Sequence, residues 1–147
     1  MRYTFLTENQ GNSFYPVANR DIQAAENRLA LTFPKELVLL YAEVGYGFIK
    51  GSEYNVNRIM DPYSVRDFRL RENDFVYYPD IEIYEAFEND KLIFFEGSES
   101  ALFSIALNES ACSPVYYYDL QIAESLEEFL RKMNTDDKYY MGMLEEL

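Results

Sequence analysis

The chain has 147 residues, of which 48% are apolar and 17% aromatic, so it has enough core-forming side chains to exclude a disordered protein. It contains no histidine and one cysteine, which excludes His-based catalytic triads, His-based zinc sites and an internal disulfide. The net charge is −13, and residues 72–147 carry 18 acidic and 4 basic side chains, a net of −14. This charge repels nucleic acid and anionic membranes and favours a basic partner, although acidity can also serve solubility alone.

The length fits a single domain covering residues 1–147. The N-terminal residues Met1–Glu8 contain no apolar run of signal-peptide length. Apolar clusters such as Leu92–Phe95 are far too short to cross a bilayer. We therefore expect one domain in the cytoplasm, monomeric or dimeric.

Two helices are predicted in the first third of the chain, after an irregular stretch at residues 1–18. Asn19 is a good N-cap for the first helix, and the second begins at Pro34 and ends at Gly45. The short link Leu31–Pro34 predicts that the two helices pair as an αα-hairpin. Apolar residues at helical spacing are Ile22, Ala25 and Leu29 in the first helix and Leu37, Leu40, Tyr41 and Val44 in the second, central one.

Two short strands are predicted next, at Phe48–Lys50 and Tyr54–Met60, after a sharp turn at Gly45–Gly47. Asp61 followed by Pro62 predicts the start of a short helix that runs to about Leu70. This helix places Val65 and Phe68 inward.

Arginines around this helix form a local basic cluster, which is one possible signature of a phosphate or nucleic-acid site. Carboxylates are interspersed among them, so internal ion pairing on a solvated surface is the preferred interpretation, with Arg58 holding the Asp-Pro turn. The cluster consists of Arg58, Arg66, Arg69 and Arg71, and the carboxylates are Asp61, Asp67, Glu72 and Asp74.

The segment Phe75–Asp90 is compatible with a helix or a strand. As a helix it would be capped by Asp80, with Ile81, Tyr84 and Phe87 on one side and Glu82, Glu85 and Glu88 on another. As a strand it would place Ile81 and Ile83 on one face. Tyrosines beside carboxylates suit contact with a basic partner, but a core face backed by a solvated face explains the same pattern.

The last third of the chain predicts an antiparallel meander followed by two helices. The strands are Lys91–Glu96, Ala101–Leu107 and Val115–Tyr118, with a turn at Gly97–Ser100 between the first two. Ser125–Glu128 fits a capping box that opens a helix. The apolar residues at helical spacing are Leu126, Phe129, Leu130 and Met133 in that helix, and Tyr140, Met143, Leu144 and Leu147 in a final helix from about Asp136. The predicted fold class is therefore α+β, with a central, mainly antiparallel sheet packed by an N-terminal helix pair and by C-terminal helices.

The sequence shows no catalytic, metal or cofactor motif. Cys112 has no His partner to activate it, and glycine-rich phosphate loops and EF-hand spacing are absent. A pair of carboxylates acting as in a glycosidase is the one enzymatic option left, and any acidic protein offers such pairs. We expect a binding protein rather than an enzyme, with no cofactor and no metal.

The order of these segments resembles the SUKH superfamily, which includes fungal regulators of cell-wall synthesis and many bacterial immunity proteins. The resemblance covers residues 19–133. It lies in Glu26–Leu29, the second helix opened by Phe33–Leu37, the strands at Leu92–Phe95, Ser104–Ile105 and Val115–Tyr118, and the helix containing Ala123–Leu130. These motifs form the fold and carry no catalytic residue.

The resemblance implies a domain that binds and neutralises a cognate bacterial toxin without catalysis. The toxin is expected to be basic, possibly a nuclease, because an acidic inhibitor suits a basic phosphate-binding groove. Neither nucleic acid nor a membrane is an expected partner. The predicted contact residues are Tyr77, Tyr78, Asp80, Glu82, Glu85 and Glu88. The alternative function is a cytoplasmic regulatory adaptor of the cell-wall-regulator type.

Overall fold

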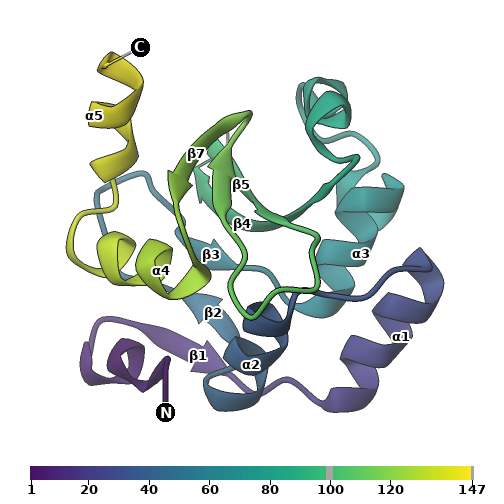
Figure 1. The fold of residues 1–147 in the computed structure, drawn as a ribbon, viewed down its shortest axis with the longest axis horizontal. Helices are drawn as coiled ribbons and strands as arrows, with labels where there is room; N and C mark the ends of the chain where they lie inside the picture. The colour runs from purple at the N-terminus through teal and green to yellow at the C-terminus, as the bar shows by residue number, and fades with distance from the viewer. Residues whose placement is uncertain (99–100, 147) are drawn as a thin grey trace.

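An open antiparallel sheet crosses the molecule, and its strands follow one another in space in the order of the chain (Figure 1). The computed structural model describes residues 1–98 and 101–146. Every strand pair is antiparallel, so the predicted α+β class is confirmed. The seven strands in these described residues are β1 (Ser13–Tyr15), β2 (Tyr46–Phe48), β3 (Arg58–Ile59), β4 (Lys91–Ser98), β5 (Ala101–Ala106), β6 (Val115–Tyr117) and β7 (Leu120–Ala123).

Helices lie around this sheet, α4 and α5 at one end in Figure 1 and α1 and α3 at the other. Phe129 of α4 packs on the sheet centre, with its ring centroid 5.1 Å from that of Phe95 and 5.4 Å from that of Phe103. The α-helices are α1 (Asn19–Leu29), α2 (Lys35–Glu43), α3 (Pro62–Leu70), α4 (Leu126–Thr135) and α5 (Tyr139–Glu145), and the 3-10 helices are η1 (Thr4–Glu8), η2 (Asn73–Phe75) and η3 (Ile81–Phe87).

The meander at β4–β6 is confirmed, and β5 is buried along almost its whole length. β7 was not predicted. The turn before it contains Tyr118 at φ 56°, a left-handed conformation that the sequence does not signal with Asn-Gly or Asp-Gly. Of the predicted turn at Gly97–Ser100, Gly97 and Ser98 belong to β4, whereas Glu99 and Ser100 lie outside the described residues, as does Leu147 of the final helix.

The expectation of an irregular lead-in at residues 1–18 is wrong, because this stretch contains η1 and β1. Tyr3 and Leu6 are fully buried. The backbone amide of Tyr3 donates to Glu43 Oε1 at 2.8 Å, and β1 pairs with β2. These partners are 30 or more residues away in the chain, so no local periodicity announces them.

The predicted pairing of α1 with α2 as an αα-hairpin is also wrong, because α1 packs beside α3 (Figure 1). A groove lined by residues of both α1 and α2 lies between these two helices. Ala30 ends α1 in a left-handed conformation, and Pro34 continues the chain with an extended ψ of 143°. The link therefore carries α2 away from α1. The caps differ by one residue from the prediction: Asn19 and Lys35 are the first helical residues, after Ala18 and Pro34.

The short strands after α2 depend on two glycines with positive φ. A Cβ at Gly45 would collide with the carbonyl oxygen of Tyr15, and one at Gly47 would collide with that of Ser13. β1 can therefore lie tightly against β2, which begins two residues earlier than predicted. Only Arg58–Ile59 of the predicted Tyr54–Met60 strand forms a strand.

Asp137 holds the loop before β3, in which Tyr54 and Asn57 have positive φ instead of the extended conformation of a strand. Its buried carboxylate accepts hydrogen bonds from the amide of Ser52 at 2.7 Å, the hydroxyl of Ser52 at 2.6 Å, and the side-chain amides of Asn55 and Asn57 at 2.9 and 2.8 Å. Burial opposes ionisation of Asp137, but these hydrogen bonds outweigh it and lower its pKa to about 2. The loop is thereby tied to the link between α4 and α5.

The helix predictions with local start signals are confirmed. α3 begins at Pro62 after Asp61, with Val65 and Phe68 fully buried. α4 begins after Ser125, whose hydroxyl accepts from the amide of Glu128 at 3.1 Å. Three of the four arginines around α3 form the expected internal ion pairs: Arg58 with Asp61, Arg66 with Asp67 and Arg71 with Glu88, each at 2.9 Å. Arg69 donates instead to the backbone carbonyl of Lys91 at 2.8 Å.

Glu36, in the first turn of α2, is a buried carboxylate with 1% of its surface exposed. Its carboxylate accepts from the amide of Ser113 at 2.6 Å, from the amides of Leu126 and Glu127 at 3.2 and 3.4 Å, and from the hydroxyl of Tyr3 at 3.2 Å. Four distant segments therefore meet at one carboxylate.

Replacing Glu36 with Ala should lower the free energy of unfolding by about 3–5 kcal/mol, because the buried donors around it lose their acceptor. Chemical denaturation measures this change. The control Glu145→Ala, at an exposed position of α5, should change stability by less than about 0.5 kcal/mol. Equal stability of the two variants would contradict the role given to Glu36.

The depressed pKa of Asp137 predicts acid sensitivity. Its ionised form stabilises the fold above the pKa of the unfolded chain, near 4, and this contribution is lost as the pH falls toward 2. Asp137→Asn should therefore reduce stability at pH 7 by on the order of 1–2 kcal/mol, and the difference from the natural chain should shrink between pH 4 and 2. A difference that is constant over this range would refute the assignment.

Candidate partner-binding surface

The segment Tyr77–Glu88, called the acidic segment below, lies at the surface beyond α3 and consists of the end of a turn and the helix η3. Of the two predicted alternatives for this segment, a helix and a strand, the helix is correct, and it is a 3-10 helix. A 3-10 helix has three residues per turn, so Ile81, Tyr84 and Phe87 stack on one side, where Tyr84 is buried and the other two are half-buried. Asp80 precedes η3 as predicted, but it makes no side-chain cap hydrogen bond.

Phe68 of α3 anchors this segment to the fold. Its ring makes edge-on contacts with Tyr78 and Tyr84, at centroid distances of 6.0 and 5.9 Å, and with Phe75 of η2 at 5.2 Å. The guanidinium of Arg71 lies over the same ring at 4.9 Å. Edge-on aromatic pairs are favourable, so one helix side chain holds both the start and the middle of the segment.

Tyr118, in the turn between β6 and β7, provides the second anchor. Its ring stacks on that of Tyr84 with centroids 5.4 Å apart and planes inclined by 8°, and it meets Phe87 edge-on at 5.5 Å. The two tyrosine hydroxyls are 3.5 Å apart. Burial raises the pKa of Tyr84, which keeps its hydroxyl protonated.

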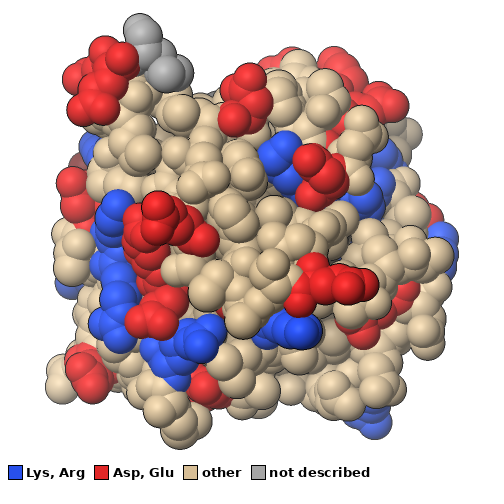
Figure 2. All heavy atoms as spheres, in the orientation of Figure 1, with Lys and Arg blue, Asp and Glu red and all other residues tan. Residues whose placement is uncertain are grey.

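The outward side of the acidic segment combines carboxylates with exposed apolar groups. Tyr77 is 94% exposed, and Asp80, Glu82 and Glu85 are exposed as well. Within residues 1–98 and 101–146, no basic side chain forms an ion pair with these three carboxylates. Figure 2 shows acidic side chains gathered over this part of the molecule, at its upper right.

Two of the predicted contact residues face the fold instead. Glu88 is 9% exposed, and its Oε1 lies 2.9 Å from Nη1 of Arg71. Burial raises the pKa of Glu88, and Arg71 opposes this shift. Tyr78 is half-buried and donates its hydroxyl to Glu96 at 3.4 Å. These two residues hold the segment in place, whereas Tyr77, Asp80, Glu82 and Glu85 face outward.

Two exposed apolar residues of this surface were missed by sequence analysis. Val76 is 47% exposed and Ile83 is 46% exposed. The sequence did contain a signal for the exposure of Ile83, because this residue lies outside the three-residue repeat of Ile81, Tyr84 and Phe87, which face the fold. Exposed apolar side chains rimmed by polar ones are a feature of protein interaction sites, so Val76 and Ile83 supply the apolar part of this surface.

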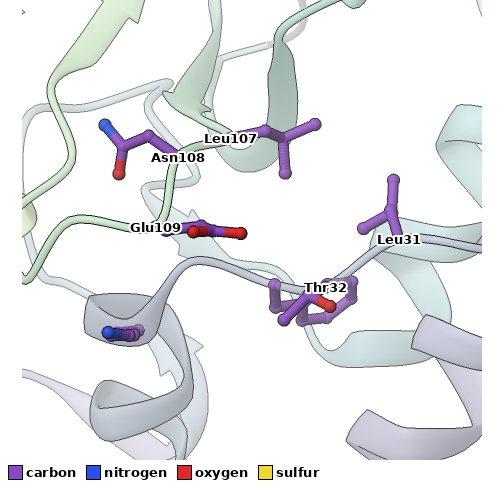
Figure 3. A pocket seen from close by; sticks show the side chains of 7 residues that line it. Leu31, Thr32, Leu107, Asn108 and Glu109 are labelled. Carbon is purple, nitrogen blue, oxygen red and sulfur yellow. The ribbon is translucent and has the colours of Figure 1, made fainter.

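The hollows formed by the described residues offer fewer charged groups for binding a partner than the acidic segment does. A hollow of about 530 Å³ lies between the α1–α2 link and the loop after β5. Figure 3 shows Leu107 and Glu109 extending from one wall toward Leu31 and Thr32 on the other. Across residues 1–98 and 101–146, no three His, Cys, Asp or Glu side chains are grouped so as to hold a metal ion, and no helix is long and apolar enough to cross a membrane.

Comparisons with known proteins add two findings. A family model described as SMI1-KNR4 cell-wall (SUKH_6) matches residues 19–130. Immunity protein YxxD of Bacillus subtilis (strain 168) is 64% identical over 146 residues, which cover 99% of both chains. The similarity therefore includes the sheet, the helices around it and the acidic segment.

Removing the Tyr118 ring should loosen η3 while leaving the sheet intact. In Tyr118→Ala, amide hydrogen exchange in Ile81–Phe87 should be about tenfold faster or more, because the stacking contact with Tyr84 is lost. Tyr118→Phe keeps the ring and serves as the control, with nearly unchanged exchange. Unchanged exchange in the alanine variant would show that Phe68 alone holds the segment.

Proposed function

Since this chain belongs to the SMI1-KNR4 cell-wall family (SUKH_6), and since an immunity protein shares 64% of its residues, we propose that it is an immunity protein that binds and neutralises a cognate toxin. An immunity protein acts by binding, which agrees with the expectation of a non-enzymatic chain. Its location in the cytoplasm remains part of the proposal.

The observation that carries the proposal for the binding site is the set of unpaired carboxylates on the acidic segment. Three other acidic groups near it are neutralised within the fold: Glu72 pairs with Arg28 at 2.6 Å, Glu88 with Arg71 and Asp90 with Lys91. Asp80, Glu82 and Glu85 have no such pair among the described residues, and they surround exposed Tyr77 and Ile83. A basic partner would pair these charges and cover the apolar groups between them.

This chemistry supports a basic toxin, and within that class we propose a nuclease. A nuclease must present a positively charged groove to the phosphates of its substrate. An acidic inhibitor is attracted to such a groove at long range, which raises the association rate and allows capture of a lethal enzyme at low concentration. The chain need supply no catalytic group for this function.

Charge reversal tests the binding surface. The triple variant Asp80→Lys, Glu82→Lys, Glu85→Lys should associate with the toxin encoded beside the gene of this chain about 10- to 100-fold more slowly at low salt, because steering by the acidic segment is lost. Stopped-flow or surface-plasmon measurements of the association rate provide the comparison. Glu88 is left unchanged because it is buried in an ion pair with Arg71.

A variant with the same net charge provides the control. Glu109, Glu124 and Glu145 are exposed and lie outside the acidic segment. Replacing these three glutamates with lysine should slow association with the toxin far less than the charge reversal in the acidic segment does. If both triple variants associate equally slowly, overall charge rather than this surface governs binding. If the natural chain binds no such toxin but binds several weaker cytoplasmic partners, the regulatory adaptor function replaces the proposal.

A further inference from the structure

The strand register defines a second exposed surface next to the acidic segment. Ser13, Phe48, Arg58 and Glu96 lie directly opposite one another across β1, β2, β3 and β4, so they share one face of the sheet. Tyr15 lies opposite Tyr46 two residues away, on the same face. The opposite face carries Ile59 and Phe95, which are fully buried. Tyr15, Tyr46 and Phe48 are called the outer aromatic face below.

This face is exposed although it consists of large aromatic side chains. Tyr15 is 47% and Phe48 38% exposed, and the Tyr15 and Tyr46 rings lie 5.4 Å apart. The backbone beneath them belongs to the paired strands β1 and β2, whose close approach depends on Gly45 and Gly47. Tyrosine and phenylalanine side chains have few rotatable bonds, so they lose little entropy on binding, and aromatic residues are enriched in protein interfaces.

A row of residues across β2, β3 and β4 links the outer aromatic face to the start of the acidic segment. Phe48 and Glu96 are separated by one strand, a distance of about 10 Å at the usual spacing between strands. Glu96 accepts the hydroxyl of Tyr78, where the acidic segment begins. Arg58 lies between them, but its charge is neutralised by Asp61 at 2.9 Å, and its guanidinium also donates to Ser64 at 2.6 Å. No unpaired positive charge separates the two surfaces along this row of residues.

Interface size gives a reason for one partner to cover both surfaces. A stable protein complex usually buries about 800 Å² and about 20–30 residues on each side. The acidic segment Tyr77–Glu88 is shorter than this, and two of its residues face inward. The adjoining outer aromatic face supplies the apolar area that a tight complex needs, while the carboxylates supply attraction at long range.

We propose that the toxin contacts both surfaces at once, with Tyr15 and Phe48 as apolar anchors and the acidic segment as the charged part of one interface. This inference rests on the proposed function, because the occupant is the same basic toxin. It assigns different kinetic roles to the two parts. The charges govern association, and the aromatic anchors govern dissociation.

The test measures binding of the full chain to the toxin encoded beside its gene. The double variant Tyr15→Ser, Phe48→Ser should dissociate at least about tenfold faster, with an association rate close to that of the natural chain. The single variant Phe48→Gln should show the same change to a smaller degree, and it keeps the test valid if the double variant unfolds. Met141→Ser, at a 48% exposed position of α5, is the matched control and should leave both rates unchanged.

Three results would overturn the inference, and they are distinguishable. Unchanged dissociation of both aromatic variants, with slowed association of the charge-reversal variant, refutes the outer aromatic face and leaves the proposed function standing. A natural chain that binds no toxin refutes both. A dimer of the chain alone by light scattering, converted to a monomer by Phe48→Gln while toxin binding is unaffected, assigns the face to a second copy of this chain.

Discussion

The buried carboxylate of Glu36 imposes the constraint on which the rest of this fold depends. A charged group without access to water must be surrounded by hydrogen-bond donors, and here the donors come from Tyr3, Ser113 and the first turn of α4. Two of them are backbone amides at the start of a helix, where the helix dipole also favours a negative charge. The position of Glu36 therefore fixes the N-terminal segment, the loop before β6 and α4 relative to α2.

The acidic side chains of this protein fall into two groups with different uses. Glu36 and Asp137 are buried and satisfied by donors of the fold, so they hold segments together and are inaccessible to a partner. Asp80 just before η3 and Glu82 and Glu85 within it are exposed, and they have no ion pair among the described residues. The net negative charge therefore includes structural carboxylates, and a separate exposed group carries the proposed interaction.

Elements whose start is signalled by neighbouring residues were predicted correctly, whereas elements that depend on contacts with residues far away in the chain were not. Asp61 before Pro62 and the hydroxyl of Ser125 located α3 and α4, because helix starts depend on neighbouring residues. β1 forms by pairing with the distant β2, and β7 follows a turn in which Tyr118 has a left-handed conformation. Neither strand was therefore visible in the local pattern of apolar and turn residues. For the candidate site, the three-residue spacing identified the inward side of η3. The burial of Glu88 and the stacking of Tyr118 could not be predicted, since both depend on side chains from other elements.

If a basic toxin binds this chain through the acidic segment, salt must weaken the complex, because it screens the charges across the interface. Calorimetry of the purified chain with the toxin encoded beside its gene, at low and at high ionic strength, measures this effect. We expect one-to-one binding with a larger Kd at high ionic strength. Equal Kd values at both ionic strengths, or no binding, would rule out charge pairing through this segment.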